Sequence, residues 1–375
     1  MGSQDPSVRI VPDYVHTDGE DAVKILAAGR LFVDPWQAGV LHDWMWRTEE
    51  EIWSAPTCGL SVPRQNGKTL DTTGRMASGM VMYAEWIVYT AHLQKTATET
   101  FMELKGLFES RSLKKYVKEI KAALGREQII LKNGGRVVFV ARTRNGGRGL
   151  HGDLLVFDEA QELTPEQQAS FLPAISASRN PQTIYLGTPP DENCTGDVFK
   201  NIREKALNGS SASTAWTEYS VNEIGDVTDR ARWAACNPAL GRRMRESTIA
   251  AECEQMNEDT FARERLGWWS PVNNDQDYAI DKTKWEACAS DQGKPEGKTA
   301  YQVPIGASQG TMSALGYSQT WSLGSGSTGE LYLTKLDKKL LGVGCKINFS
   351  NPFEEIISED NQAEVEAPDV EEVIL

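Results

Sequence analysis

The stretch that decides the fold is Val62-Pro63-Arg64-Gln65-Asn66-Gly67-Lys68-Thr69. It follows Leu60-Ser61-Val62, a short apolar run typical of a strand that leads into a loop. A loop before a helix N-terminus directs backbone N–H groups and the positive end of the helix dipole at an anion. Gly67 lets the backbone approach closely, Lys68 can reach phosphate oxygens, and the Thr69 hydroxyl can ligate a divalent metal. The stretch therefore predicts a phosphate-binding loop.

A second stretch, Leu154-Leu155-Val156-Phe157-Asp158-Glu159, predicts a buried strand that ends in two adjacent carboxylates. Ligands of open α/β sheets bind at the carboxyl edge of the strands, where both carboxylates would lie. Asp158 is placed to hold Mg²⁺, and Glu159 to orient and polarise an attacking water. Together the two stretches predict a site that binds ATP with Mg²⁺ and hydrolyses it.

The loop departs from the usual pattern, which has glycine six residues before the lysine, because Val62 stands there. The tripeptide Gly-Lys-Thr alone is a weak signal, and it occurs again at Gly297-Lys298-Thr299. An ordinary helix start and a solvated strand end are the alternatives for each stretch taken separately. The prediction depends on both stretches occurring in this order, each after a strand-like run.

Strand-like runs alternate with helical patterns around these stretches, which predicts an α/β fold with a parallel sheet covered by helices on both faces. Strands are expected at Glu85–Thr90 and Leu154–Phe157, a hairpin at Gln128–Leu131 and Arg136–Ala141, and helices at Ala97–Leu107 and Glu246–Arg265. A further helix begins at Pro165, with Thr164 as its N-cap.

The expected organisation has five parts, of which the first, residues 1–6, is interpreted as an expression remnant outside the fold. The others are a P-loop ATPase core at 7–200, a small helical linker subdomain at 201–272, a β-rich segment at 273–350 and a disordered acidic tail at 351–375. Strands in the fourth part are expected at Gly329–Leu336 and Val343–Phe349.

The net charge of −14 is unevenly distributed. Residues 354–375 contain nine carboxylates and no Lys or Arg, a block typical of a solvated, disordered tail. The body is therefore only mildly acidic, which leaves room for local basic surface that binds nucleic acid phosphates. The six scattered cysteines predict neither a zinc ribbon nor a disulfide framework. No secretory signal opens the chain, and no apolar run reaches the roughly 18 residues of a membrane span.

Several segments in the same order resemble the large terminase subunits of tailed bacteriophages, the ATPases that package DNA into procapsids. The resemblance extends over about residues 20–272. The segments are Pro35-Trp36-Gln37, the loop at 63–69, Gly187-Thr188-Pro189-Pro190, Asn237-Pro238-Ala239-Leu240-Gly241, and Phe261–Trp269. This resemblance implies a P-loop NTPase of the ASCE type that translocates double-stranded DNA.

The resemblance also implies roles for single residues. Gln37 would read adenine, since its amide can both donate and accept, and Thr188 would belong to a motif that senses the γ-phosphate. Arg64 would act as an arginine finger, in cis or in trans, a group that contributes about 10³–10⁵ in rate. Gln65 and Asn66 would complete the nucleotide loop. The implied partners are DNA, a portal protein, a small terminase subunit and further copies in a ring, a pentamer in the family, in the host bacterial cytoplasm at the procapsid portal.

A basic Gly-rich loop at residues 142–149 carries Arg142, Arg144 and Arg148. These side chains are candidates to contact DNA phosphates or the nucleotide of a neighbouring subunit, and Arg148 is the best single candidate. The alternative is a solvated basic loop without a specific role.

A full terminase carries a ribonuclease-H-like nuclease after the ATPase region, where carboxylates from separate strands bind two metal ions. Here no acidic residue occurs between Glu296 and Glu330, so we expect the nuclease to be missing or degenerate. Asp277, Glu330 and Asp337 could be remnants of a metal site, but surface charge is the preferred interpretation.

Three alternatives stay open: a metal-dependent endonuclease in residues 273–375, another P-loop nucleic-acid translocase, and an assembly protein with a degenerate site. A helicase would need a second motor domain, for which residues 273–375 are too short. The presence of Lys68, Thr69, Asp158 and Glu159 argues against a degenerate site.

Overall fold

The computed structural model describes residues 1–123, 125, 127–143, 146–191, 194 and 196–270, and the strand segments 303–308, 311–315, 321–326, 329–333 and 344–346. The chain divides into two compact units, Met1–Ser270 and Pro271–Leu375. The predicted acidic tail at 351–375 and Arg144 lie outside the described residues.

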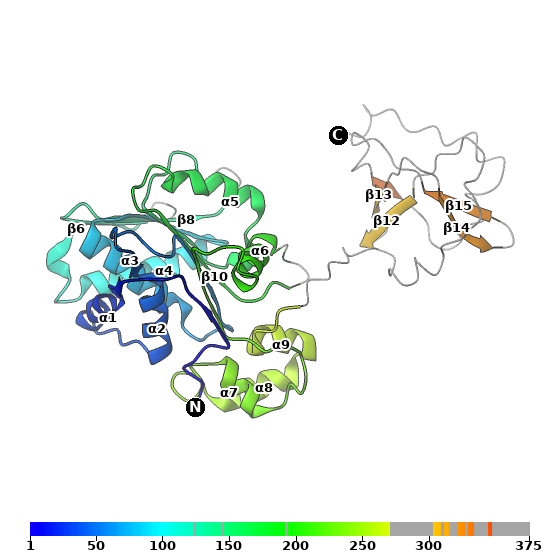
Figure 1. The fold of residues 1–375 in the computed structure, drawn as a ribbon, viewed down its shortest axis with the longest axis horizontal. Helices are drawn as coiled ribbons and strands as arrows, with labels where there is room; N and C mark the ends of the chain where they lie inside the picture. The colour runs from blue at the N-terminus through cyan, green and yellow to red at the C-terminus, as the bar shows by residue number, and fades with distance from the viewer. Residues whose placement is uncertain are drawn as a thin grey trace. The chain divides into compact units, whose positions relative to one another are not determined.

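The first unit is built on a nine-stranded sheet with the order β1-β11-β4-β10-β9-β5-β8-β7-β6. Figure 1 labels β6, β8 and β10 among its strands. Its strands are β1 (Val8–Ile10), β4 (Thr57–Ser61), β5 (Trp86–Ala91), β6 (Val117–Lys121), β7 (Gln128–Leu131), β8 (Arg136–Ala141), β9 (Leu154–Phe157), β10 (Gln182–Gly187) and β11 (Thr214–Glu218). The six strands from β11 to β8 run parallel, and antiparallel pairs extend the sheet at both ends. The predicted α/β class with a largely parallel sheet is confirmed.

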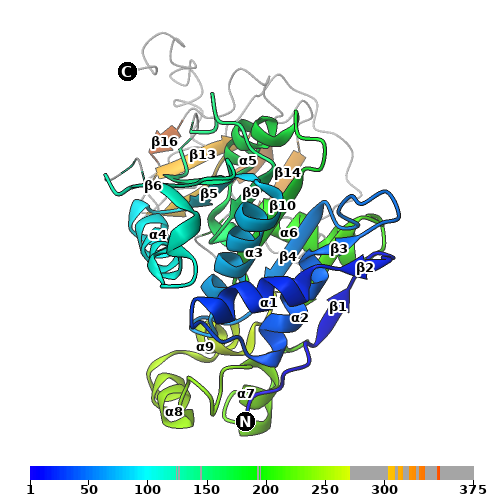
Figure 2. The ribbon, with the colours of Figure 1, turned by 90° about the vertical axis from the view of Figure 1, so that its left-hand side faces the viewer.

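Helices cover both faces of this sheet. The first face carries α1 (Gly19–Ala28), α2 (Pro35–Trp44), α3 (Lys68–Tyr83) and α4 (Gln94–Glu109), which Figure 2 shows in front of the strands. The other carries α5 (Pro165–Phe171) and α6 (Asp197–Leu207), with the short helices η2 (Ala160–Glu162) and η3 (Leu172–Ile175); η1 (Lys114–Tyr116) follows α4. Side chains alternate between the faces along a strand, so Ile87 and Tyr89 join the core under α1–α4 while Val88 joins the core under α5 and α6.

Several predicted elements are found where the sequence places them. The strand Leu154–Phe157 has the predicted bounds, and β7 and β8 form the expected antiparallel hairpin. Thr164 caps α5 by accepting a hydrogen bond from Gln167 N, with Pro165 at the first helical position. The sheet, however, runs past the predicted boundary at residue 200, which falls inside α6, because β11 inserts between β1 and β4.

The helical subdomain consists of α7 (Arg230–Cys236), α8 (Glu246–Gln255) and α9 (Glu258–Leu266), packed around a core of its own. The prediction of one helix over Glu246–Arg265 is wrong. Met256 is extended, and the Asn257 side chain accepts a hydrogen bond from Thr260 N, so a second helix starts there.

Residues 1–6, interpreted from the sequence as an expression remnant, contact the folded chain. Gly2 N donates to Leu240 O at 2.7 Å and Ser3 N to Ala234 O at 2.7 Å. The Gln4 amide donates to Pro238 O at 2.9 Å. These residues therefore pack on α7 and on the loop that joins α7 to α8.

The two edges of the sheet differ from its interior. On one edge, β1 has three residues and pairs with β11. On the other, β6 exposes Lys118, Glu119 and Lys121, and its pairing with β7 shifts register between Val117 and Glu119. Such a shift is a β-bulge, which bends and twists the strand.

Smaller sheets occur in addition to the nine-stranded sheet. β2 (His16–Thr17) pairs with β3 (Trp46–Arg47) in the first unit. In the second unit, β12 (Val303–Ser308), β13 (Thr311–Leu315) and β16 (Gly344–Lys346) form one sheet, and β14 (Trp321–Gly326) pairs with β15 (Gly329–Leu333). The strands β15 and β16 lie within the two segments predicted as strands. Within the described residues, each helix is too short or too polar to span a lipid bilayer.

Candidate nucleotide site

The predicted phosphate loop joins the end of β4 to the start of α3. Gln65 and Gly67 adopt left-handed backbone conformations, with φ of 64° and 102°. Gly67 is the N-cap of α3, and a Cβ there would lie 3.3 Å from the Arg243 guanidinium and 3.3 Å from the Gln37 amide. The first N–H groups of a helix have no partner within the helix. The loop and α3 thus present N–H groups and a helix dipole to an anion.

Lys68 points back across the loop. Its Nζ donates to Val62 O at 2.9 Å, so the ammonium is held inside the curve of the loop. The residue is half-buried, and burial of its ammonium end lowers the pKa of Lys68 to about 8, against the attraction of Asp158. Thr69, also half-buried, follows in the first turn of α3.

The carboxylate turn follows β9. Asp158 is 7% exposed, and its Oδ2 accepts a hydrogen bond from Tyr89 Oη at 2.5 Å while its Oδ1 accepts one from Glu159 N at 2.8 Å. Glu159 has a left-handed φ of 51°. Its carboxylate accepts from His92 N at 3.2 Å and from the Thr96 hydroxyl at 3.3 Å. Both carboxylates are thereby oriented by groups at the end of β5 and in α4.

The strand β10 lies between the loop strand β4 and the carboxylate strand β9. Gly187 O, at its end, accepts from Val62 N at 3.3 Å. Thr188 follows, 4% exposed, and its N–H donates to Gln161 Oε1 at 3.3 Å. Since the carboxyl ends of parallel strands share one edge, Lys68, Thr188 and Asp158 belong to one site.

The donors at this edge suit Mg²⁺ in a nucleotide complex. No group of three or more His, Cys, Asp or Glu residues that could hold a metal occurs among the described residues. Mg²⁺ usually takes one or two protein oxygens and completes its octahedron with phosphates and water. Asp158 and Thr69 offer one carboxylate and one hydroxyl, which fits that pattern.

The side chain of Gln37 is fully buried against the loop. Its Nε2 donates to Gly67 O at 3.0 Å. Its Oε1 accepts from Asp34 N at 2.9 Å and from the Arg243 guanidinium at 3.1 Å. Gln37 therefore supports the loop in this structure, and its role in reading adenine stays a prediction that requires these bonds to exchange.

Asn66 connects the loop to the helical subdomain. It is fully buried; its Nδ2 donates to Pro63 O at 3.1 Å and to Asn237 Oδ1 at 3.0 Å, and its Oδ1 accepts from Ala239 N at 3.0 Å. Asn237 in turn donates to Arg265 O at 2.7 Å. Asn66 thus has a supporting role that the residue type alone does not reveal.

Arg64 and Gln65 contact α9. Arg64 is 60% exposed at its side chain, and its Nε lies 2.6 Å from Glu264 Oε2. The Arg265 guanidinium donates to Arg64 O at 2.8 Å and to Gln65 Oε1 at 3.2 Å. The sequence reasoning missed Glu264, Arg265 and Asn237 as loop partners, although all three lie in segments that carry the family resemblance. The finger role of Arg64 stays a prediction.

The alternative of a solvated loop without a specific role is wrong for Arg142. This side chain is 5% exposed, and burial lowers the pKa of Arg142 to about 10, with attraction by Asp158 and Glu159 opposing the shift. Its guanidinium donates to Asp158 O at 2.5 Å and Glu159 O at 2.9 Å. Arg142 therefore binds the backbone of the carboxylate turn in this structure, and its candidacy for contact with DNA or with another subunit's nucleotide stays a prediction.

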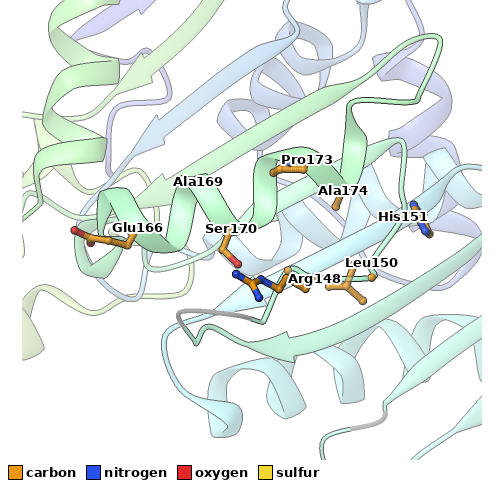
Figure 3. Close-up of a pocket in the computed structure, with 10 residues that line it drawn as sticks. Arg148, Leu150, His151, Glu166, Ala169, Ser170, Pro173 and Ala174 are labelled. Carbon is orange, nitrogen blue, oxygen red and sulfur yellow. The ribbon is translucent and has the colours of Figure 1, made fainter.

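Arg148 is exposed at a hollow of about 470 Å³ beside α5 and η3. Figure 3 shows its guanidinium next to Ser170, whose buried hydroxyl has no hydrogen-bond partner among the residues that the structure describes. The lining residues are Gly147, Arg148, Gly149, Leu150, His151, Glu166, Ala169, Ser170, Pro173 and Ala174. Arg148 stays a candidate for contact with DNA or with another subunit.

Comparison with known proteins gives structural relatives only. No protein-family model matches the chain, and no curated protein matches its sequence. The crystal structure of the HK97 bacteriophage large terminase is 20% identical with a TM-score of 0.58, over 79% of this chain and 61% of that one. The ATPase domain of the Thermus phage P74-26 large terminase is 12% identical with a TM-score of 0.47, over 66% and 98%. The large terminase of another thermophilic bacteriophage, solved with ADP, is 14% identical with a TM-score of 0.43, over 68% and 54%.

The chain spans less than two thirds of the HK97 protein that it matches. The chain has the fold of a bacteriophage large terminase.

Proposed function

We propose that this protein is the ATP-hydrolysing motor of viral DNA packaging, which moves double-stranded DNA into a procapsid. The observation that carries the proposal is the meeting of three strand ends at one sheet edge. They bring the Lys68 loop, Thr188 and the Asp158–Glu159 turn to one site. The fold shared with the HK97 large terminase supports the choice of motor among P-loop proteins.

In this proposal each side chain has a defined task. The loop N–H groups and Lys68 bind the phosphates of ATP, and Thr69 and Asp158 hold Mg²⁺, which neutralises charge on the phosphates. Tyr89 fixes the direction of the Asp158 carboxylate through its 2.5 Å hydrogen bond. Glu159 accepts a hydrogen bond from the attacking water and aligns it with the γ-phosphate. Arg64, once it leaves Glu264, stabilises charge that develops during transfer.

The partners follow from the same proposal. DNA would be held through phosphate contacts, without sequence readout. A portal protein, a small terminase subunit and further copies in a ring, five in the family, would complete the motor in the host cytoplasm. We further propose that residues 273–375 hold no competent nuclease, because the segment between Glu296 and Glu330 has no carboxylate.

The first test is Mg²⁺-dependent ATP hydrolysis by the wild type, Glu159→Ala and Glu109→Ala, with and without duplex DNA. Glu159→Ala is expected to lower kcat by at least about 100-fold, since the group that orients water is removed. Glu109 is an exposed carboxylate at the end of α4, so its variant should match the wild type. No hydrolysis by the wild type under any condition would contradict the proposal and favour an assembly protein.

A plasmid-cleavage assay with Mn²⁺ on the same preparations tests the nuclease. We expect the plasmid to stay intact. Cutting that persists in Glu159→Ala and stops with a chelator would show a working endonuclease in residues 273–375.

A further inference from the structure

Arg142 joins the ends of three neighbouring strands. It follows β8, and its backbone N–H donates to Ala91 O at 2.9 Å, which continues the ladder with β5. Its side chain then reaches across β5 to the end of β9. Nη1 donates to Thr90 O at 3.3 Å and to Asp158 O at 2.5 Å, and Nη2 donates to Glu159 O at 2.9 Å. One guanidinium therefore holds both carbonyls of the carboxylate turn.

The chemical setting of this arginine is unusual. Within the described residues, its hydrogen bonds go only to backbone carbonyls, and its Nε is buried without a partner. A buried charge without a paired carboxylate is costly, and an apolar side chain of similar length would fill the same space. A buried arginine that departs from the rule that buried charges are paired is expected at a functional site.

The backbone of the Asp158–Glu159 turn, which Arg142 holds, is itself strained. Glu159 adopts a left-handed φ of 51°, a conformation that L-residues other than glycine seldom take. In that conformation the Glu159 carboxylate meets His92 N and the Thr96 hydroxyl. The carbonyls of Asp158 and Glu159 both accept hydrogen bonds from the Arg142 guanidinium, which holds the turn in this conformation.

We propose that Arg142 is a positioning residue for ATP hydrolysis: it fixes the backbone of the Asp158–Glu159 turn and so aims the Glu159 carboxylate. This inference rests on the proposed function of the same site. It gives Arg142 a role inside its own subunit, distinct from contact with DNA or with a neighbouring nucleotide.

The test compares Arg142→Lys and Arg142→Met with Arg136→Met. Arg136 begins the same strand and stacks over Trp86 at 3.5 Å, so it is a matched control remote from the carboxylate turn. ATP affinity, kcat and KM are measured for each protein, and kcat is expressed per nucleotide-binding site. Hydrogen exchange is followed in peptides that contain residues 154–163 and 57–61.

For Arg142→Met we expect kcat to fall by about 10- to 100-fold, as for supporting groups of catalytic residues. KM should change by less than about threefold, because the phosphate loop is untouched. Arg142→Lys should recover part of kcat, since an ammonium can donate to one or two of the carbonyls but lacks the fork. Exchange should accelerate in residues 154–163 and stay unchanged in residues 57–61.

Equal kcat per site in Arg142→Met and Arg136→Met would overturn the inference, as would a loss confined to ATP affinity. Unchanged exchange in residues 154–163 would overturn it as well. If Arg142→Met does not fold, Arg142→Lys decides by the same criteria. If the wild type does not hydrolyse ATP, the proposed function fails, whereas hydrogen exchange still decides whether Arg142 holds the turn.

Discussion

Lys68 is the residue on which nucleotide binding is expected to depend most directly. Burial lowers the pKa of Lys68 to about 8, from the ordinary range near 10.5. A phosphate partner favours the charged lysine and raises its pKa again. Above pH 8, Lys68 is therefore largely deprotonated in the nucleotide-free protein. Binding of ATP must then be accompanied by uptake of one proton by Lys68.

We predict that the affinity for a non-hydrolysable ATP analogue falls with pH above about 8, approaching tenfold per unit while proton uptake nears one. Calorimetry in two buffers of different ionisation enthalpy measures that uptake directly. Lys68→Arg is the control, because a guanidinium keeps its proton and should abolish the pH dependence of any remaining affinity. An affinity that stays constant between about pH 7 and pH 9.5 would rule out the lowered pKa.

The motif residues could be predicted from the sequence because their neighbours along the chain carry the signal. Lys68 and Thr69 follow a glycine in a loop, and Asp158 and Glu159 follow an apolar run. The burial of Arg142 could not be predicted, because an arginine in a Gly-rich stretch is typical of a surface loop. Its true partners are carbonyls 16 and 17 residues away, which only the packing of three strands brings together.

At the scale of elements, a buried ion pair connects α3 to the sheet. The Arg75 guanidinium donates to both carboxylate oxygens of Glu85, at 2.7 and 3.0 Å, and to Gln182 Oε1 at 2.9 Å. Arg75 is fully buried and Glu85 is 6% exposed. Gly79 makes room for the carboxylate, since a Cβ there would lie 1.9 Å from Glu85 Oε2.

Replacing Glu85 by Ala should destabilise the protein by about 3–5 kcal/mol, because it leaves the Arg75 charge buried without a counter-charge. Urea unfolding monitored by circular dichroism measures the change. Asp21→Ala, which removes an ion pair with Lys24 on the exposed face of α1, should leave the midpoint unchanged. Equal shifts of the urea midpoint in the two variants would show that the buried ion pair stabilises the protein no more than the exposed one.

The elements that the sequence predicted correctly are those specified by residues adjacent along the chain. The bounds of β9 were predicted because the strand is short, apolar and ended by charges. The place of β11 in the sheet was not, since the parallel pairing of Thr214–Glu218 with β4 depends on contacts far apart in sequence. The break between α8 and α9 had a usable signal, an asparagine followed by two acidic residues, which is typical of a helix start.

For the whole molecule, Arg148 raises the question of which subunit completes the site. It is exposed beside the hollow lined by α5 and η3, whereas Arg64 and Arg142 are engaged by Glu264 and by the carboxylate turn. Among the three candidate arginines that the structure describes, Arg148 is therefore the one best placed to act on another subunit's nucleotide.

If Arg148 acts in trans, Arg148→Ala and Lys68→Ala should each lose ATP hydrolysis, but their mixture should regain part of it. An interface that joins an intact Lys68 site to an intact Arg148 occurs only in mixed rings, because such head-to-tail contacts use different surfaces of the two copies. Steady-state hydrolysis at increasing ratios of the two variants measures the recovery. A mixture as inactive as its components, under conditions in which wild-type subunits assemble, would contradict the prediction.

The edges of the large sheet have a consequence for the behaviour of many copies in a crowded cell. An exposed strand edge offers unpaired N–H and C=O groups to any passing chain, and long flat edges promote aggregation. Here one edge is only three residues long, and the other combines a bulge with Lys118, Glu119 and Lys121. Both edges are therefore poor templates for pairing with the sheet of another copy, and we expect contacts between copies to use side-chain surfaces.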